Sequence, residues 1–163
     1  DRLVGSEMCI RDSSSVMRRA SEMDHIKEIF QIGLRSAGSA RPEETQAALD
    51  YGANLITDIE LQEVGMKAIL DRIPDGNNYY LTIDADGVDP TIMPAVAGPA
   101  PGGVSYSQMR TLIQGLVNKG RMLGMDIVEI TPKKDLNGIT AITAGRFICN
   151  LIGTAVRAGY FKK

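Results

Sequence analysis

The chain has 163 residues, of which 44% are hydrophobic and 23% charged, as expected for one ordinary globular domain. A net charge of −2 without a basic block argues against nucleic acid as a partner. No uninterrupted apolar run reaches about 18–20 residues, so we expect no membrane-spanning segment. The two cysteines lie far apart and form neither a disulfide framework nor a zinc motif, and we expect a cytoplasmic protein.

The first residues differ in character from the rest of the chain. DRLVGSEMCIRDSS has no initiator methionine and no secretory pattern. The run SEMCIRD is similar to translated sequencing adaptor, and the alternative is an ordinary solvated terminus. We expect residues 1–13 to be a non-native leader and residues 14–163 to belong to the natural protein, with its upstream part missing.

From residue 16 onward, hydrophobic periodicity alternates between helical and strand-like segments. In chain order it predicts a helix over 16–23, a strand over 28–34, a helix over 41–52, a strand over 53–58, a helix over 61–74, a strand over 79–84, a helix over 105–120, a strand over 121–130 and a helix over 139–161. Strands separated by helices imply βαβ units, and therefore an α/β fold with a mainly parallel sheet covered on both faces.

Local signals refine this outline. Ser105 or Ser107 is expected to cap the helix that follows, and the Gly102-Gly103 pair to form a tight turn, because no lysine-bearing helix follows it as a phosphate loop requires. The pattern of residues 121–130 predicts a strand that is buried on both faces. Cys149 is expected to be a small buried hydrophobe.

Three aspartates end an apolar run in the segment LTIDADGVDP, residues 81–90. Ligands in open α/β sheets bind beyond the C-terminal ends of the strands. If strand geometry continues, Asp84 and Asp86 share a face at about 6.5–7 Å and repel each other unless one keeps a proton or a cation binds. A hard ion such as Mg²⁺ or Mn²⁺ suits such oxygen ligands, whereas the alternative is that both residues only cap the loop. Asp89, before a proline, is expected to be structural.

Glu129 stands near the end of another predicted strand. Its position between Val128 and Ile130, in an otherwise apolar segment, favours a functional acid over a solvated one at a strand end. Asp126 and Asp135 are expected to organise loops.

These motifs together resemble the ureohydrolase family of arginases and agmatinases. TIDADGVDP followed by PGG resembles the family signature S-x-D-x-D-x-x-D-P with its later P-G-G, and GMDIVEITPKKD resembles D-x-V-E-x-x-P-x-x-D. IFQIGLR resembles the family's middle strand with its arginine, and TAITAGRFICNLIG its closing T-A-x-x-A-x-R helix. The resemblance covers about residues 15–161, is closest to the agmatinase branch, and implies a three-layer αβα arginase-like fold that is incomplete here.

The resemblance also implies a chemistry. Asp84 would bridge two Mn²⁺ ions, Asp86 would bind one of them, and Glu129 would accept hydrogen bonds from the guanidinium group of the substrate. The ions would activate water to attack the guanidinium carbon, so that the parent protein hydrolyses an agmatine-like guanidino compound to urea and an amine. Family members of this kind imply a homo-oligomer, either a trimer or a hexamer.

The chain also departs from the family pattern. An upstream histidine and a D-x-H-x-D strand, which supply the other metal ligands, are not in this sequence, and His25 matches no ligand position. The family's proton-handling histidine would fall at about Ser13. We therefore expect weak metal binding and no turnover by this chain alone. Ala95–Pro99 replaces the usual G-T-G-T-P, so agmatine, guanidinobutyrate, guanidinopropionate and arginine all stay open as substrates.

Two other functions stay open at this point. The chain could be a non-catalytic, truncated or degenerate family member that acts only as an assembly subunit. Alternatively, it could be an unrelated Mg²⁺-dependent α/β enzyme in which the D-x-D motif binds a phosphate substrate.

Overall fold

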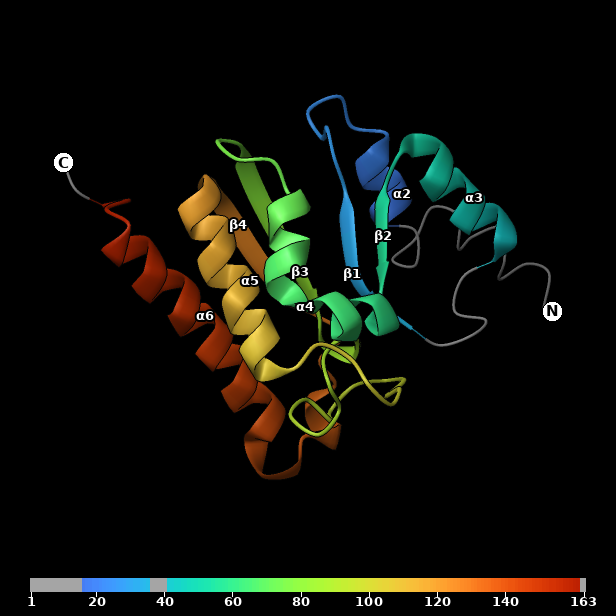
Figure 1. Ribbon diagram of the computed structural model, residues 1–163. Helices are drawn as coiled ribbons and strands as arrows, with labels where there is room; N and C mark the ends of the chain where they lie inside the picture. The colour runs from blue at the N-terminus through green and yellow to red at the C-terminus, as the bar shows by residue number, and fades with distance from the viewer. Residues whose placement is uncertain (1–15, 36–40, 162–163) are drawn as a thin grey trace. The chain divides into compact units, whose positions relative to one another are not determined.

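The computed structural model describes residues 16–35 and 41–161, and it confirms the predicted order of helices and strands (Figure 1). The suspected leader at residues 1–13 lies outside the described residues. The chain divides into two compact units. The second comprises Gly33–Arg35 and the chain from Thr57 onward, and the first comprises the rest of the chain up to Ile56.

The first unit contains helices α2 at Val16–Ser21 and α3 at Pro42–Tyr51 and most of a two-stranded sheet, formed by β1 at Phe30–Leu34 and β2 at Asn54–Thr57. The last residues of the two strands, Gly33, Leu34 and Thr57, are counted with the second unit. Helix α3 begins with a proline and two acids, which favour a helix start, and it ends at Gly52 in the left-handed conformation. Ile29 and Ile56 are buried in this unit, and His25 is exposed.

The second unit contains helices α4 at Asp58–Arg72, α5 at Tyr106–Lys119 and α6 at Ile139–Arg157, with strands β3 at Asn78–Asp84 and β4 at Arg121–Val128. Helix α5 contacts α4, α6 and β4 (Figure 1). Ser105, rather than Ser107, caps α5 through a reciprocal capping box with Gln108. The largest fully buried side chains of this unit include Phe147, Leu61, Ile69, Ile83, Met93 and Ile113.

Strands β3 and β4 are parallel neighbours, and their register places Asp84 opposite Val128. The C-terminal ends of the two strands therefore meet at the same edge of the sheet. Side chains of β3 alternate across the sheet, so that Ile83 is buried while Thr82 and Asp84 lie on the exposed face.

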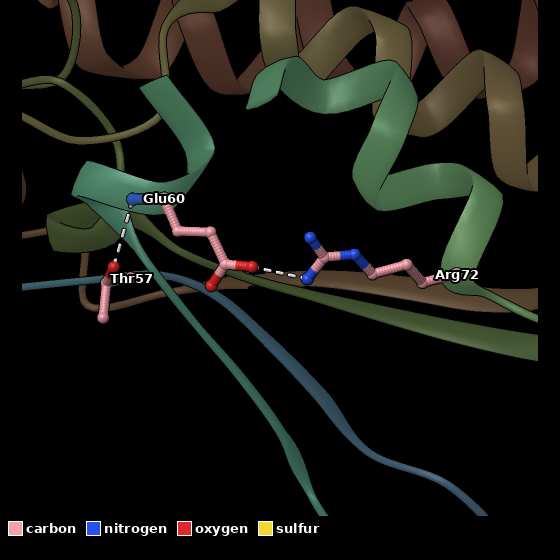
Figure 2. A network of polar contacts seen from close by, with 3 residues as sticks. All are labelled: Thr57, Glu60 and Arg72. Atoms are coloured by element: carbon pink, nitrogen blue, oxygen red, sulfur yellow. Dashed lines mark hydrogen bonds and ion pairs between the residues drawn. The ribbon is translucent and has the colours of Figure 1, made fainter. Parts of the chain in front are cut away.

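Helix α4 bends at Gly65, whose φ of 79° and ψ of 155° are outside the helical region. Thr57 caps its first turn by accepting a hydrogen bond from Glu60 N, and the Glu60 carboxylate pairs with Arg72 at 2.5 Å (Figure 2). Twelve residues of straight helix would separate these two positions by about 18 Å. The bend at Gly65 is therefore what lets the two ends of α4 meet.

Two burial predictions are wrong. β4 is not buried on both faces: α5 packs against the strand and Met122 is buried, but Leu123, which points to the opposite face, is 63% exposed. Cys149 is exposed, since the side of α6 that faces α5 is formed by Ala144, Phe147 and other residues. An apolar pattern indicates that a surface suits burial, and it does not identify which element covers it.

The segment Leu136–Arg157, which includes α6, is long and apolar enough to cross a membrane by length and composition, and a third of it is buried in the protein. Its buried side packs on α5, where Tyr106 and Phe147 stack with ring centroids 5.4 Å apart.

Candidate active site at the ends of β3 and β4

Asp84 is the last residue of β3, and the strand geometry does not continue beyond it. Residues Ala85–Gly87 form a 3-10 turn instead, and Asp84 Oδ1 accepts a hydrogen bond from the backbone N–H of Asp86 at 3.2 Å. The expectation that Asp84 and Asp86 share one face of an extended strand is therefore wrong. The turn nevertheless keeps the two carboxylates close enough to act on each other, as the pKa of Asp84 indicates.

Partial burial and electrostatic repulsion raise the pKa of Asp84 from 3.8 to about 6. The largest cause is loss of hydration, although one side of the residue faces solvent, and the next cause is the negative charge of Asp86. The hydrogen bond from Asp86 N opposes the rise, and the charge of Glu129 adds to it. Because neighbouring carboxylates repel one another when all are ionised, the site favours binding of a cation or of a proton at neutral pH.

Glu129 lies one residue beyond the end of β4, so the expectation that it stands inside an apolar strand is wrong. Its φ of 61° is left-handed, which is rare for a residue with a side chain. Because Val128 pairs with Asp84, Glu129 follows directly after the position opposite the first aspartate. Left-handed backbone of this kind costs free energy and concentrates at functional sites.

The other acids of these segments have structural partners, although Asp126 lies inside β4 and joins two strands rather than organising a loop. Asp126 accepts hydrogen bonds from the hydroxyls of Tyr80 at 2.8 Å and Thr82 at 2.5 Å across the two strands. Asp89 accepts one from Thr91 N at 2.8 Å, which closes the turn at the proline.

Asp135 caps helix α6 from outside it, by accepting hydrogen bonds from Thr140 N and Ala141 N, both at 3.0 Å. Partial burial would raise the pKa of Asp135, but these backbone donors outweigh it and hold the pKa below the usual value. Its carboxylate is thus committed to the helix, and it is not available as a ligand.

Arg35 is a residue to which the sequence analysis assigned no role, although it noted the arginine at the end of IFQIGLR. Its guanidinium donates hydrogen bonds to backbone carbonyls of the turn after Asp84 and of the segment before Gly102. The arginine at the end of IFQIGLR is the only sequence signal of this contact, because its acceptors lie 51 residues or more further along the chain.

The loop Ala95–Pro99 is anchored beside Glu129. Val96 forms an antiparallel bridge with Ile130, and Lys134 Nζ donates to the carbonyls of Val96 and Ala97 at 3.1 and 3.2 Å. Ala95 and Val96 are buried, whereas Ala97 and Gly98 are exposed. The loop therefore belongs to the same end of the sheet as the candidate site.

The residues of the site suit a hard metal ion in chemistry but not in number. Asp84 and Asp86 supply carboxylate oxygens, which Mn²⁺ and Mg²⁺ prefer, and their mutual repulsion would be relieved by a cation. Within residues 16–35 and 41–161, no three His, Cys, Asp or Glu side chains are grouped to hold a metal. Further ligands would have to come from elsewhere.

The chain matches the model of the arginase family over residues 8–153, a region that begins inside the suspected leader. It is 28% identical over 138 residues to the N(1)-aminopropylagmatine ureohydrolase of Thermus thermophilus, which covers 83% of this chain and 45% of that protein. The solved structure of proclavaminate amidinohydrolase from Streptomyces clavuligerus is 29% identical, with a TM-score of 0.66 over 79% of this chain and 42% of that one.

Arginase from Bacillus subtilis is 28% identical, with a TM-score of 0.67 over 76% of this chain and 45% of its own. These likenesses confirm the predicted arginase-like α/β fold and exclude the hypothesis of an unrelated phosphate-binding enzyme. The chain spans less than half the length of these relatives. By its match over nearly the whole sequence, the chain belongs to the arginase family.

Proposed function

We propose that this chain carries one part of the active site of a metal-dependent hydrolase that cleaves a guanidino compound to urea and an amine. One observation supports the proposal above all others. The mutually repelling carboxylates of Asp84 and Asp86 lie at the end of β3, beside Glu129 at the end of β4, in a chain of the arginase family.

Asp84 and Asp86 would hold the metal, which we propose to be a pair of Mn²⁺ ions in the complete site. When bound, such ions lower the pKa of water and stabilise the charge that develops during attack on a guanidinium carbon. Asp84 must lose its proton before it can bind a cation, and its raised pKa means that protons compete with metal below about pH 6.

Glu129 would bind the substrate rather than the metal. A carboxylate accepts paired hydrogen bonds from a planar guanidinium, and such charge-assisted pairs are directional. The exposed position of Glu129 leaves its oxygens open to a ligand, and its left-handed backbone fixes the direction in which the side chain leaves the chain. The expected result is orientation of the guanidinium carbon toward the aspartates.

The substrate that we propose is an agmatine-like guanidino compound. The printed names of the relatives refer to different substrates, aminopropylagmatine and proclavaminate among them. The anchored loop Ala95–Pro99 lacks the family's threonine hydroxyls and pairs with Ile130 through Val96, and we propose it as the source of substrate preference. We further propose that the complete protein is a cytoplasmic homo-oligomer, a trimer or hexamer.

The test is urea release, with and without added Mn²⁺, from agmatine, guanidinobutyrate, guanidinopropionate and arginine. It should be run on this chain and on the product of the open reading frame read upstream of residue 13. We expect urea from the complete product only, and loss of urea formation after chelation. If a complete product with all its metal ligands releases no urea from any guanidine, the proposal is wrong. If the upstream histidine and D-x-H-x-D are absent from the gene, the chain is a non-catalytic assembly subunit.

A further inference from the structure

The guanidinium of Arg35 lies where two loops of the second unit meet. Both loops turn backbone carbonyls toward it, one from the turn that follows Asp84 and the other from the segment before the glycine pair. Its hydrogen bonds reach Asp86 O at 2.5 Å, Gly87 O at 3.1 Å, Val88 O at 3.4 Å, Ala100 O at 3.0 Å and Pro101 O at 3.1 Å.

This arrangement needs the shape of an arginine side chain. Several donors in one rigid plane are required to reach carbonyls on two separate loops, and lysine has a single nitrogen. The loops also leave no room for a side chain at Gly103, where a Cβ would lie 2.9 Å from Arg35 Cζ and 2.9 Å from Gly87 O. The glycine pair thus permits the close approach that encloses the arginine.

The contact fixes Asp86 from both sides of its backbone. Its N–H donates to Asp84 Oδ1, and its carbonyl accepts from Arg35. Next to it, Gly87 O accepts from Val104 N, and Asp89 N donates to Val104 O, which ties the same turn to the segment after the glycine pair. With both peptide groups held, the direction in which the Asp86 side chain leaves the backbone is set.

We propose that Arg35 is a positioning residue of the metal site, which acts by holding the carbonyl of Asp86 and thereby aiming its carboxylate beside that of Asp84. The inference rests on the proposed function, since it assumes that the two aspartates bind a metal. Groups that orient metal ligands from outside the coordination shell commonly change metal affinity 10–100-fold when they are altered, and we expect a loss of about this size.

The experiment measures Mn²⁺ affinity of the full chain by electron paramagnetic resonance for the parent, Arg35→Lys and Asp86→Asn, and for the double variant. Arg72→Lys is the matched control, because it makes the same substitution in a residue that pairs with Glu60. We expect Arg35→Lys to weaken binding about 10–100-fold and Arg72→Lys to leave it unchanged. In the Asp86→Asn background, Arg35→Lys should weaken binding no further.

Amide hydrogen exchange without metal provides a second readout. Arg35→Lys should increase exchange at Asp89 N and Val104 N while the β3–β4 ladder keeps its protection. Gly103→Ala leaves Arg35 in the sequence, but its Cβ would push the guanidinium aside. It should likewise increase exchange at Asp89 N and Val104 N and leave the β3–β4 ladder protected.

The outcomes separate this inference from the function on which it rests. A parent chain that binds no Mn²⁺ would overturn the metal site itself. A parent that binds Mn²⁺ together with an Arg35→Lys variant that binds it equally well would overturn only the role of Arg35. Arg35 would be a structural residue if Arg35→Lys weakened Mn²⁺ binding equally in the parent and in Asp86→Asn. Loss of the folded state in both Arg35→Lys and Gly103→Ala would lead to the same conclusion.

Discussion

Replacing Asp84 with asparagine should stabilise the metal-free chain at neutral pH and abolish its response to metal. Asparagine keeps the oxygen that accepts from Asp86 N but removes the charge that Asp86 and Glu129 repel. The rise in the pKa of Asp84 from 3.8 to about 6 would correspond to about 3 kcal/mol for a fully enclosed group. Since Asp84 faces water on one side, screening reduces this, and we expect about 1 kcal/mol.

The sign of the pH dependence follows from the direction of the shift. The unfolded chain ionises Asp84 near 3.8 and the folded chain near 6, so the parent loses stability as pH rises between these values. The advantage of Asp84→Asn should therefore be absent below about pH 4, grow up to about pH 6 and stay constant above it. Urea denaturation followed by circular dichroism, at several pH values, measures the difference between the two proteins.

Added Mn²⁺ should make the parent more stable than Asp84→Asn at neutral pH. At about 1 mM it should stabilise the parent, because a ligand that binds only the folded state raises its stability, and leave Asp84→Asn unchanged. Asp126→Asn is the control, since Asp126 accepts two hydroxyl hydrogen bonds and its replacement should not stabilise the chain. An Asp84→Asn variant that is less stable than the parent at pH 7, or whose difference is independent of pH, would refute the repulsive pair.

Three further predictions concern the elements that build the site. Gly65→Ala should lower the free energy of unfolding, measured by urea denaturation, by about 1–3 kcal/mol, because alanine is strained in the backbone conformation of Gly65. The control, Gly145→Ala, lies in regular helix with open space for a Cβ and should stabilise the chain by about 0.5–1 kcal/mol. Equal effects of the two substitutions would contradict the bend at Gly65. Asp135→Ala should lower the Tm by roughly 2–4 °C at neutral pH. Since the pKa of Asp135 is lowered in the folded chain, the difference in Tm between parent and variant should disappear as pH falls below about 3.8. A difference in Tm that persists in acid would refute the cap. In the complete enzyme, Glu129→Ala should raise KM and lower kcat while metal content is unchanged, and loss of metal would instead make Glu129 a ligand.

The sequence predicted the elements and the motifs because their signals are local. Periodicity indicated every described α-helix and strand, Ser105 was one of the two expected caps of α5, and Asp89 closed the expected turn. Each of these depends on residues within a few positions of one another, which a pattern can record.

What the sequence did not predict depends on contacts between distant segments or on backbone angles. The hydrogen bonds of Arg35 go to backbone carbonyls that follow it by 51 to 66 residues, and a carbonyl is present in every residue, so no residue type marks them. Hydrophobic periodicity assumes regular geometry, so it cannot predict the bend at Gly65 or the left-handed conformation of Glu129. The exposure of Cys149 followed from where α5 packs on α6, which the pattern of α6 alone did not specify.

The central claim is that the ends of β3 and β4 form the part of the active site that this chain supplies. Its most direct test compares Mn²⁺-dependent urea release by the complete protein with that of Asp84→Ala and of Asp126→Ala, which removes a carboxylate from the neighbouring strand. We predict that Asp84→Ala abolishes both urea release and metal binding, and that Asp126→Ala retains metal and releases urea. Urea release by Asp84→Ala within about twofold of the parent would contradict the account, because loss of a metal ligand should remove the ion on which the attack on the guanidinium carbon depends.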